Sequence, residues 1–209
     1  YWVKVFELPK MGRTARGRAL VNVLDLQDGE HVTGVIPVEE FDEEYSLFMA
    51  TAGGTVKKTS LDAFGKRGSG GIIALDLAED DRLIGVQRTT GDQEVMLGTR
   101  NGRAIRFHES DVREMGRTAA GVRGIKLRDE DRVVNLTVLP EGAEEDEWTI
   151  LTVCENGYGK RTLVEEYSTQ NRGGLGLVDI KTTKRNGKVV AVRSVRGNEH
   201  LMVITEGGK

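Results

Sequence analysis

The chain contains few cysteine, proline and aromatic residues, and this composition limits the kinds of fold and packing that it can have. One cysteine in 209 residues excludes an internal disulfide framework. That residue, Cys154, lies in an apolar segment, which predicts a buried small side chain rather than a reactive thiol. Aromatic residues make up 5% of the chain, so its packed interfaces are expected to be aliphatic.

Long apolar runs are also missing. No stretch approaches the ~20 apolar residues of a membrane-spanning helix, and no secretory leader opens the chain. We therefore expect a protein of the reducing cytoplasm with no membrane contact. Only three prolines accompany 27 glycines, a balance that suits many tight turns.

What the chain does have is a repeat of hairpin-like segments: FMATAGGTVKK (48–58), VMLGTRNGRAIR (95–106), ILTVCENGYGKR (150–161) and LMVITEGGK (201–209). Their second turn glycines, Gly54, Gly102, Gly157 and Gly208, are 48, 55 and 51 residues apart. A fixed period near ~50 residues is typical of propellers and solenoids, because one unit cannot bury its apolar face without a neighbour.

A second series of glycine-and-basic stretches has the same period. Each stretch leads into a short apolar run: TARGRALVNV (14–23), KRGSGGIIAL (66–75), TAAGVRGIKL (118–127) and NRGGLGLVDI (171–180). Gly17, Gly70, Gly121 and Gly174 are 53, 51 and 53 residues apart. Two series in phase indicate a true structural repeat.

Within one unit the pattern is that of strands. Residues 95–99 alternate up to Asn101-Gly102, a dipeptide that favours a tight hairpin because both turn residues need positive φ. Strands are then expected at 104–107, 124–127 and 133–139, and Tyr1 to Phe6 reads as part of another. We therefore predict an all-β domain of four-stranded blades with a repeat of about 51 residues. The predicted units are 1–40, 46–90, 94–139 and 148–196, with a further unit beginning at 199–209, so the chain is expected to be cut within the repeat at both ends.

The formal net charge of −3 hides an uneven distribution. Ten acidic residues fall within the stretches 39–44 and 141–147, at the same place in the repeat, and setting them aside changes the formal charge to +7. These stretches are expected either to be solvated loops or to repel a ligand. The remaining surface is basic enough to attract a polyanion.

The basic residues follow the repeat. In a radial array they would fall on one rim, where they could contact a phosphate backbone, with nearby glycines letting amide groups approach it. A cation after a hairpin turn can also be merely solvated. The predicted binding residues are Arg13, Arg16, Arg18, Lys57, Lys58, Lys66, Arg67, Arg103, Arg106, Arg117, Arg123, Lys160, Arg161 and Arg172.

Several segments together carry a resemblance: YWVKVFELP, FMATAGGTVKKT, GDQEVMLGTRNGRAIRFHESDVREMG, GVRGIKL, ENGYGKRT and VITEGG. Across essentially the whole chain they resemble the C-terminal domain of the DNA gyrase A protein, from the type IIA topoisomerase family. The resemblance implies a β-pinwheel, a six-bladed propeller-like disc with strand exchange between blades, of which five are wholly or partly present here. It also implies that duplex DNA wraps around the basic edge so that gyrase can introduce negative supercoils.

The same resemblance implies a non-catalytic segment of an ATP-dependent enzyme. The DNA-cleaving tyrosine of this family belongs to the N-terminal part of the gyrase A protein, and ATP and Mg²⁺ belong to the holoenzyme, with no cofactor in this domain. The implied partners are double-stranded DNA, the rest of gyrase A, and gyrase B, with the isolated domain a monomer. The implied location is the cytoplasm, in association with the nucleoid.

The family's hallmark heptapeptide, Q-R-R-G-G-K-G, has a degenerate copy at residues 170–176, Q-N-R-G-G-L-G, which keeps five of the seven residues. It is expected to be the same loop in a later blade, with weaker phosphate contact, while the true copy is expected before Tyr1. Without that copy, wrapping of a full turn of DNA is an open expectation.

Three alternatives accompany this interpretation. The first is the equivalent DNA-bending domain of topoisomerase IV, and the second is a protein-interaction propeller with an exposed apolar patch. The third is a propeller hydrolase, for which recurring aspartates such as Asp25, Asp76 and Asp179 would have to converge, although their alternation also fits solvent-facing positions. The histidines lack metal-ligand spacing and the glycine loops lack Gly-Lys-Ser/Thr, so no catalytic or metal site is predicted.

Overall fold

The structure is a computed structural model that describes residues 1–65, 70–140, 142–143, 148–205 and 207. Its strands form three antiparallel sheets, ordered β3-β1-β2-β6, β10-β5-β4-β7 and β11-β8-β9. The first contains β1 Ser46–Thr51, β2 Thr55–Ser60, β3 Leu83–Thr89 and β6 Val122–Arg123. The second contains β4 Glu94–Thr99, β5 Arg103–His108, β7 Val133–Leu139 and β10 Leu177–Val178. The third contains β8 Thr149–Cys154, β9 Gly159–Leu163 and β11 Val189–Val195.

The 3₁₀ turns η3 Leu61–Phe64, η4 Glu109–Asp111 and η5 Val164–Glu166 directly follow β2, β5 and β9. Two others, η1 Val5–Glu7 and η2 Leu20–Asn22, precede β1. The three predicted hairpins within the described residues are present as β1-β2, β4-β5 and β8-β9. Gly54, Gly102 and Gly157 have φ of +85°, +84° and +78°, the left-handed conformation that favours glycine. Asn101 and Asn156 do not have positive φ, so the prediction that both turn residues would adopt it is wrong. In the fourth predicted hairpin, residues 201–205 form no strand, and Gly208 lies outside the described residues.

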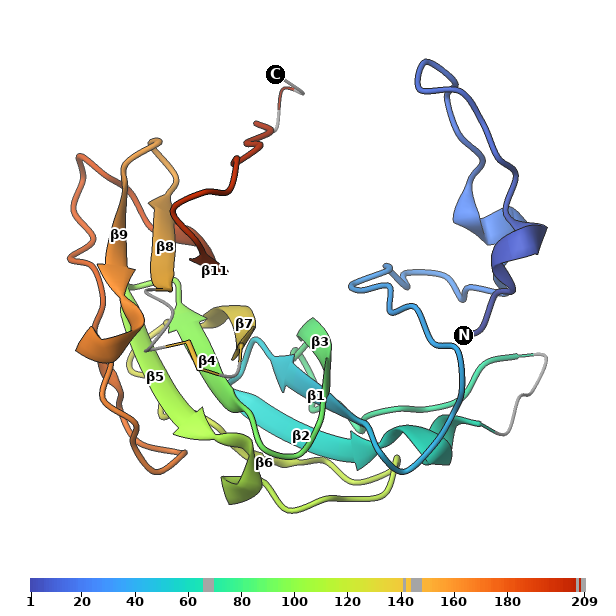
Figure 1. Ribbon diagram of the computed structural model, residues 1–209, viewed down its shortest axis with the longest axis horizontal. Helices are drawn as coiled ribbons and strands as arrows, with labels where there is room; N and C mark the ends of the chain where they lie inside the picture. The colour runs from blue at the N-terminus through green and yellow to red at the C-terminus, as the bar shows by residue number, and fades with distance from the viewer. Residues whose placement is uncertain (66–69, 141, 144–147, 206, 208–209) are drawn as a thin grey trace.

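The three sheets follow one another along an arc (Figure 1). The strands β3, β7 and β11 lie on its concave side, with β7 in contact with both β3 and β11, while β2, β5 and β9 lie on the convex side. We call the convex side, with the hairpin turns and the strands added to it, the outer edge. Successive repeats therefore present equivalent positions along one continuous surface.

Strands are exchanged between neighbouring units. The two-residue strand β6 follows the third unit's first hairpin in sequence but pairs with β2 of the preceding unit. One unit later, β10 pairs in the same way with β5. The strand predicted at 124–127 is wrong: the observed strand lies just before it, at Val122–Arg123, and completes its neighbour's sheet, in the strand exchange that the resemblance implies.

A glycine precedes each exchanged strand, and the structure corrects its position. A Cβ on Gly121 would lie 2.6 Å from the carbonyl oxygen of Val56, and one on Gly176 would overlap that of Ala104. The equivalent of Gly121 is therefore Gly176 rather than the predicted Gly174. The sequence alone did not distinguish Gly174 from Gly176, because this loop contains three glycines within four residues.

The core consists of two mainly aliphatic layers between sheets, and the middle sheet is buried on both faces. One layer includes Val95, Leu97 and Phe107, and the other includes Met96 and Ile150. Because side chains alternate along a strand, β4 supplies both layers. Most of these side chains are aliphatic, as predicted, but Phe48 and Phe107 lie together in the first layer, with ring centroids 6.3 Å apart. Cys154, 1% exposed, is buried in the second layer as predicted.

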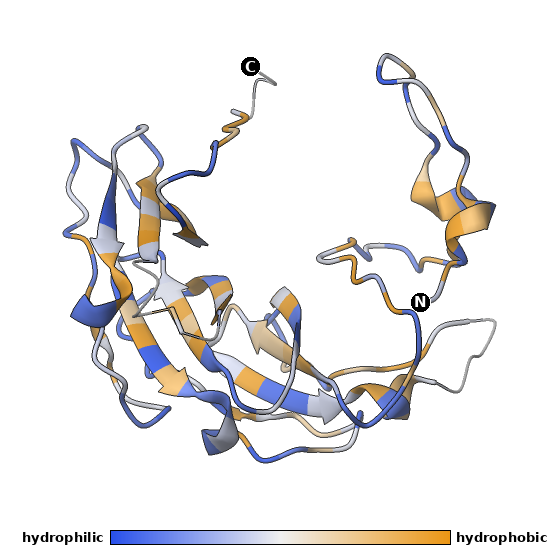
Figure 2. Cartoon of the chain, in the orientation of Figure 1, coloured by the Kyte–Doolittle hydropathy of each residue, from blue (hydrophilic) through white to orange (hydrophobic). Residues whose placement is uncertain are grey.

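Residues 1–45 contain no strand, so the strand expected at Tyr1 to Phe6 is wrong. Instead η1 begins at Val5, and Val5 and Phe6 are 81% and 80% exposed. Figure 2 shows the apolar colouring of η1 and η2 away from the three sheets. A strand exists only through pairing with a neighbour, and this segment has no such pairing among the described residues. In the described part of the chain, no helix is long and apolar enough to cross a membrane.

Candidate nucleic-acid interface

Three of the predicted cations on the hairpins are buried. Lys57 is fully buried, Lys58 is 9% exposed and Arg106 is 5% exposed. They lie on β2 and β5, the strands just inside the exchanged ones, where the following unit covers them. Their charges are used within the fold, and each can be followed to its partners.

Lys57 donates through Nζ to the carbonyl oxygens of Ala74, at 2.8 Å, and Arg117. Burial lowers the pKa of its ammonium group below the usual value, an effect that nearby Arg117 reinforces and Asp76 opposes. One of these carbonyls belongs to the unit of Lys57 itself and the other to the following unit, and both converge on one cation. Lys57 therefore joins neighbouring units.

Lys58 and Arg106 occupy the same register in successive hairpins, opposite Phe48 and Met96. Each donates hydrogen bonds to the 3₁₀ turn that directly follows the next hairpin. Lys58 Nζ donates to the carbonyl oxygen of Glu109 at 3.4 Å, and Arg106 Nη1 donates to those of Val164 and Tyr167, both at 3.1 Å.

A carboxylate accompanies each of these two cations. Lys58 Nζ lies 3.8 Å from Oε2 of Glu109, while Arg106 forms an ion pair with Glu94. The other Glu109 oxygen accepts from the backbone N–H groups of Gly91 and Gln93, at 2.9 Å each. Both cations are therefore neutralised inside the molecule.

Lys160 and Arg161, on β9, are exposed. Lys160 Nζ lies 3.6 Å from Oδ1 of Asp179, whose side chain is 1% exposed. Tyr167 donates to the same carboxylate at 2.6 Å and Thr152 at 2.7 Å, and burial together with the Asp179 hydrogen bond raises the pKa of Tyr167. The solvent-facing expectation for Asp179 is wrong, because these two hydroxyl groups and Lys160 compensate its burial.

The glycine-and-basic loops give a mixed outcome. Arg123, on the exchanged strand β6, is exposed, and so are Arg13, Arg16 and Arg18 in the N-terminal segment, away from the sheets. Arg117 and Arg172 are half-buried, and their guanidinium groups contact backbone carbonyls. Lys66 and Arg67 lie outside the described residues.

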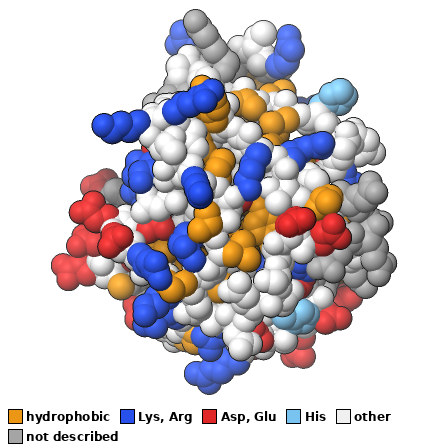
Figure 3. Space-filling model, turned by 90° about the vertical axis from the view of Figure 1, so that its left-hand side faces the viewer, with side chains coloured by type: hydrophobic (Ala, Val, Ile, Leu, Met, Phe, Trp, Pro, Cys, Tyr) orange, Lys and Arg blue, Asp and Glu red, His pale blue; other side chains and the backbone are white. Residues whose placement is uncertain are grey.

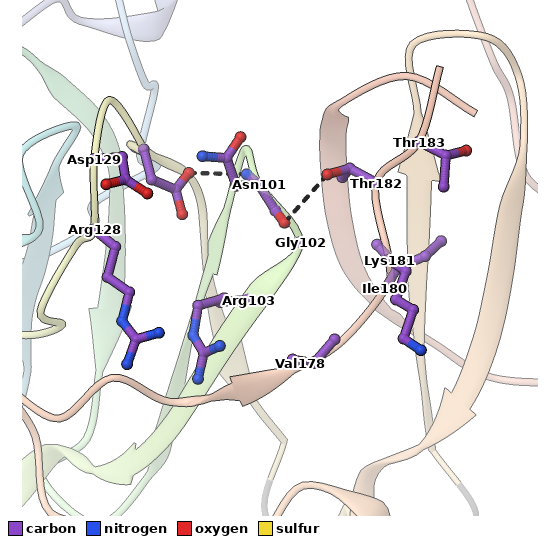
Figure 4. Close-up of a pocket in the computed structure, with 11 residues that line it drawn as sticks. Asn101, Gly102, Arg103, Arg128, Asp129, Val178, Ile180, Lys181, Thr182 and Thr183 are labelled. Atoms are coloured by element: carbon purple, nitrogen blue, oxygen red, sulfur yellow. Dashed lines mark hydrogen bonds between the residues drawn. The ribbon is translucent and has the colours of Figure 1, made fainter. Parts of the chain in front are cut away.

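A cavity of about 440 Å³ opens beside the β4-β5 turn. Its basic residues are Arg103, Arg128 and Lys181, and Figure 4 shows the Arg103 and Arg128 side chains lying side by side and pointing the same way. Arg103 donates to the carbonyls of Leu175 and Gly176 at 2.7 and 2.6 Å, which fixes its guanidinium beside β10. Asp131 accepts from Asn101 N–H at 2.8 Å and so closes the turn next to the cavity.

Arg128 and Lys181 are exposed and were not among the predicted residues. Both follow an exchanged strand within a few residues, but they are not equivalent in the repeat: with Gly121 aligned to Gly176, Lys181 corresponds to Lys126 and Arg128 to Thr183. Figure 3 views the molecule from this end and shows Lys and Arg side chains distributed down the face, with acidic side chains mainly toward the two sides. We call Arg123, Arg128, Lys160, Arg161 and Lys181 the rim set.

Comparisons with known proteins give the family. The model described as "DNA gyrase C-terminal domain, beta-propeller" matches residues 1–39, 45–90, 93–140 and 149–196. The chain therefore belongs to the DNA gyrase C-terminal domain family. The predicted all-β, propeller-like β-pinwheel fold and the resemblance to gyrase A are both confirmed.

Relatives and solved structures agree with this assignment. The chain is 50% identical over 208 residues to the DNA gyrase A protein of Salmonella typhimurium and 43% identical over 209 residues to that of Staphylococcus epidermidis, covering all of this chain and 23% of each relative. It is similar to the C-terminal domain of DNA topoisomerase IV, with a TM-score of 0.82, 27% identity, and coverage of 92% of this chain and 59% of that one. It is also similar to the DNA gyrase A C-terminal domain, with a TM-score of 0.78, 25% identity, and coverage of 94% of this chain and 62% of that one.

Proposed function

We propose that this chain is a DNA-binding part of a bacterial gyrase A protein that bends and wraps duplex DNA around its outer edge. The observation that carries the proposal is the recurrence of exposed cations along that edge, in a chain of the gyrase C-terminal domain family. Arg123 lies on the strand added to the first sheet, Arg128 and Lys181 lie beside the turn of the second, and Lys160 and Arg161 lie on the third. A phosphate backbone can follow such a series without base contacts.

Because the chain spans about a quarter of its curated relatives, the activity of the whole enzyme is part of the proposal. In it, negative supercoiling, the use of ATP and Mg²⁺, the remainder of gyrase A, and gyrase B belong to the assembled topoisomerase. This chain supplies the path of the DNA, in the cytoplasm and in association with the nucleoid. It supplies no catalytic residue.

The salt dependence of binding tests the rim set. We would measure the affinity for a fluorescent duplex by anisotropy between 50 and 200 mM salt and replace all five rim residues with Gln. Each lost phosphate contact should reduce the slope of log K against log salt by about 0.9, so the slope should fall by roughly 4 to 5. Arg88→Gln with Arg193→Gln, two exposed cations on β3 and β11 of the concave side, is the control, and its slope should change by less than about 1. An unchanged slope in the five-fold variant would remove the rim set from the proposal.

Chirality needs a separate measurement. A nicked plasmid religated with increasing amounts of the chain should show a positive linking-number shift after deproteinisation. Binding without a shift would favour a second candidate, the DNA-bending role of a topoisomerase IV domain. The TM-score of 0.82 to that domain is the observation that favours this candidate.

The hydrolase alternative loses its support from Asp179. That carboxylate is enclosed by Tyr167, Thr152 and Lys160, so it is not available to a substrate. Asp25 and Asp76 are exposed on other units and do not converge with it.

A further inference from the structure

One arginine of the degenerate heptapeptide connects two sheets. Arg172 donates through Nε to the carbonyl oxygen of Asp111 at 2.8 Å and through Nη1 to that of Arg123 at 3.1 Å. Asp111 ends η4, which directly follows β5 of the middle sheet, while Arg123 belongs to β6, the outermost strand of the first sheet. A single guanidinium therefore bridges adjacent sheets at their outer edge.

The backbone beside this arginine is attached to the same strand. Gly173 N–H donates to the carbonyl oxygen of Gly124 at 2.6 Å, and Lys126 N–H donates to that of Gly174 at 2.8 Å. The loop is thus fixed to the residues that follow β6, directly after the guanidinium contact at Arg123. Any tilt of one sheet against the other would have to break several of these bonds together.

One of the two Arg172 contacts has a counterpart one unit earlier. Arg117, in the preceding glycine-and-basic loop, donates through Nη1 to the carbonyl oxygen of Ile73 at 3.1 Å. Ile73 is two residues after Gly71 (φ +73°), as Arg123 is two residues after Gly121 (φ +94°). The Arg117–Ile73 contact is therefore equivalent to the Arg172–Arg123 contact, whereas the second contact, which completes the bridge, is observed at Arg172.

The chemistry of the bridge suits arginine. Its planar fork presents several N–H donors in fixed directions, so it can hold two carbonyls at once, whereas a lysine ammonium is a point charge on a flexible stem. A phosphate contact, by contrast, needs only charge and exposure. Arg172 is half-buried with two backbone partners, while the rim set is exposed.

We propose that Arg172 is a positioning residue that fixes the tilt between adjacent sheets at the outer edge and thereby sets the path of bound DNA. This inference rests on the proposed function for its consequence on DNA. The bridge itself does not depend on DNA and can be tested without it. The distinguishing prediction is that geometry at this position matters more than charge.

The decisive variant is Arg172→Lys, which keeps the charge and loses the fork. Its salt slope should match that of the unchanged chain, while the linking-number shift per bound chain should fall by at least half. Arg128→Gln is the control for charge, because it removes one exposed rim cation: its salt slope should fall by about 0.9, and its shift per bound chain should be retained.

Hydrogen exchange supplies the measurement free of DNA. In Arg172→Lys, amides of residues 121–125 should exchange at least threefold faster, while those of β8 keep their rate, which separates a lost bridge from general destabilisation. Unchanged exchange at 121–125 would overturn the bridge. Faster exchange with an undiminished linking-number shift would overturn its role in the DNA path. If the unchanged chain itself binds no DNA, the proposed function fails, and exchange still decides the bridge.

Discussion

Replacement of Asp179 by Asn should destabilise the fold by about 2–4 kcal/mol. The carboxylate accepts hydrogen bonds from Tyr167 at 2.6 Å and Thr152 at 2.7 Å, one on each oxygen. An Asn side chain keeps one acceptor oxygen, so one buried hydroxyl loses its acceptor, at a cost of about 1–3 kcal/mol, and the other loses a charged partner, which costs about 1 kcal/mol more. Loss of the 3.6 Å pairing with Lys160 adds little, because that side chain is 41% exposed.

Urea denaturation followed by tryptophan fluorescence measures this cost, because Trp148 packs against the same core layer. Asp25→Asn is the control, an exposed aspartate that should change the free energy of unfolding by less than about 0.5 kcal/mol. In a double-mutant cycle, Asp179→Asn and Tyr167→Phe should be coupled by about 1–2 kcal/mol. A loss for Asp179→Asn no larger than for Asp25→Asn, or no coupling, would refute the view that this carboxylate is held by its buried hydroxyls.

Three further predictions concern stability and reactivity. Because burial lowers the pKa of Lys57, the unfolded state binds more protons between the lowered pKa and 10.5, so the free energy of unfolding should rise with pH in that window. Urea titrations at several pH values should show this rise, and Lys57→Met should abolish it. A rise that persists in Lys57→Met would contradict the prediction. Cys154, whose thiol pKa is raised by burial, should react with Ellman's reagent no faster than the protein unfolds, and fast labelling of folded protein would contradict its burial. Gly176→Ala should lower the free energy of unfolding by more than about 2 kcal/mol in thermal unfolding, because φ is +62° and the new methyl group would overlap the Ala104 carbonyl. Gly157→Ala, where the new methyl group would meet open space, should lower it by only about 1 kcal/mol. Equal losses in the two variants would contradict the steric argument.

The hairpins and the repeat could be predicted from sequence because their causes are local. A turn glycine with positive φ and alternating apolar residues leave the same pattern in every unit, so β4-β5 follows from residues 95–107 alone. The exchange of β6 and β10 has no local signal, since pairing with the preceding sheet is a property of packing. The segment Tyr1 to Phe6 shows the converse case, in which a strand-like pattern finds no pairing among the described residues.

The candidate site could be predicted less well for a related reason. All five cations follow a turn glycine by three or four residues, so the repeat in the sequence predicts the same location for each of them: Lys57, Lys58, Arg106, Lys160 and Arg161. Burial separates them, and burial depends on which unit stacks on each strand. Lys66 and Arg67 lie outside the described residues and stay predictions.

The cation at one register position of the hairpins is buried in two units and exposed in the third. Lys58, Arg106 and Arg161 are paired with Phe48, Met96 and Leu151 at the same place in three successive hairpins. The first two are covered by a following unit and hold its 3₁₀ turn, whereas Arg161 lies on β9, which has no outer partner strand among the described residues, and is exposed. A cation at this register therefore binds backbone carbonyls wherever another unit stacks on it. Cations beyond the exchanged strands, such as Arg128 and Lys181, remain exposed even where a unit does stack, so they are the better phosphate contacts.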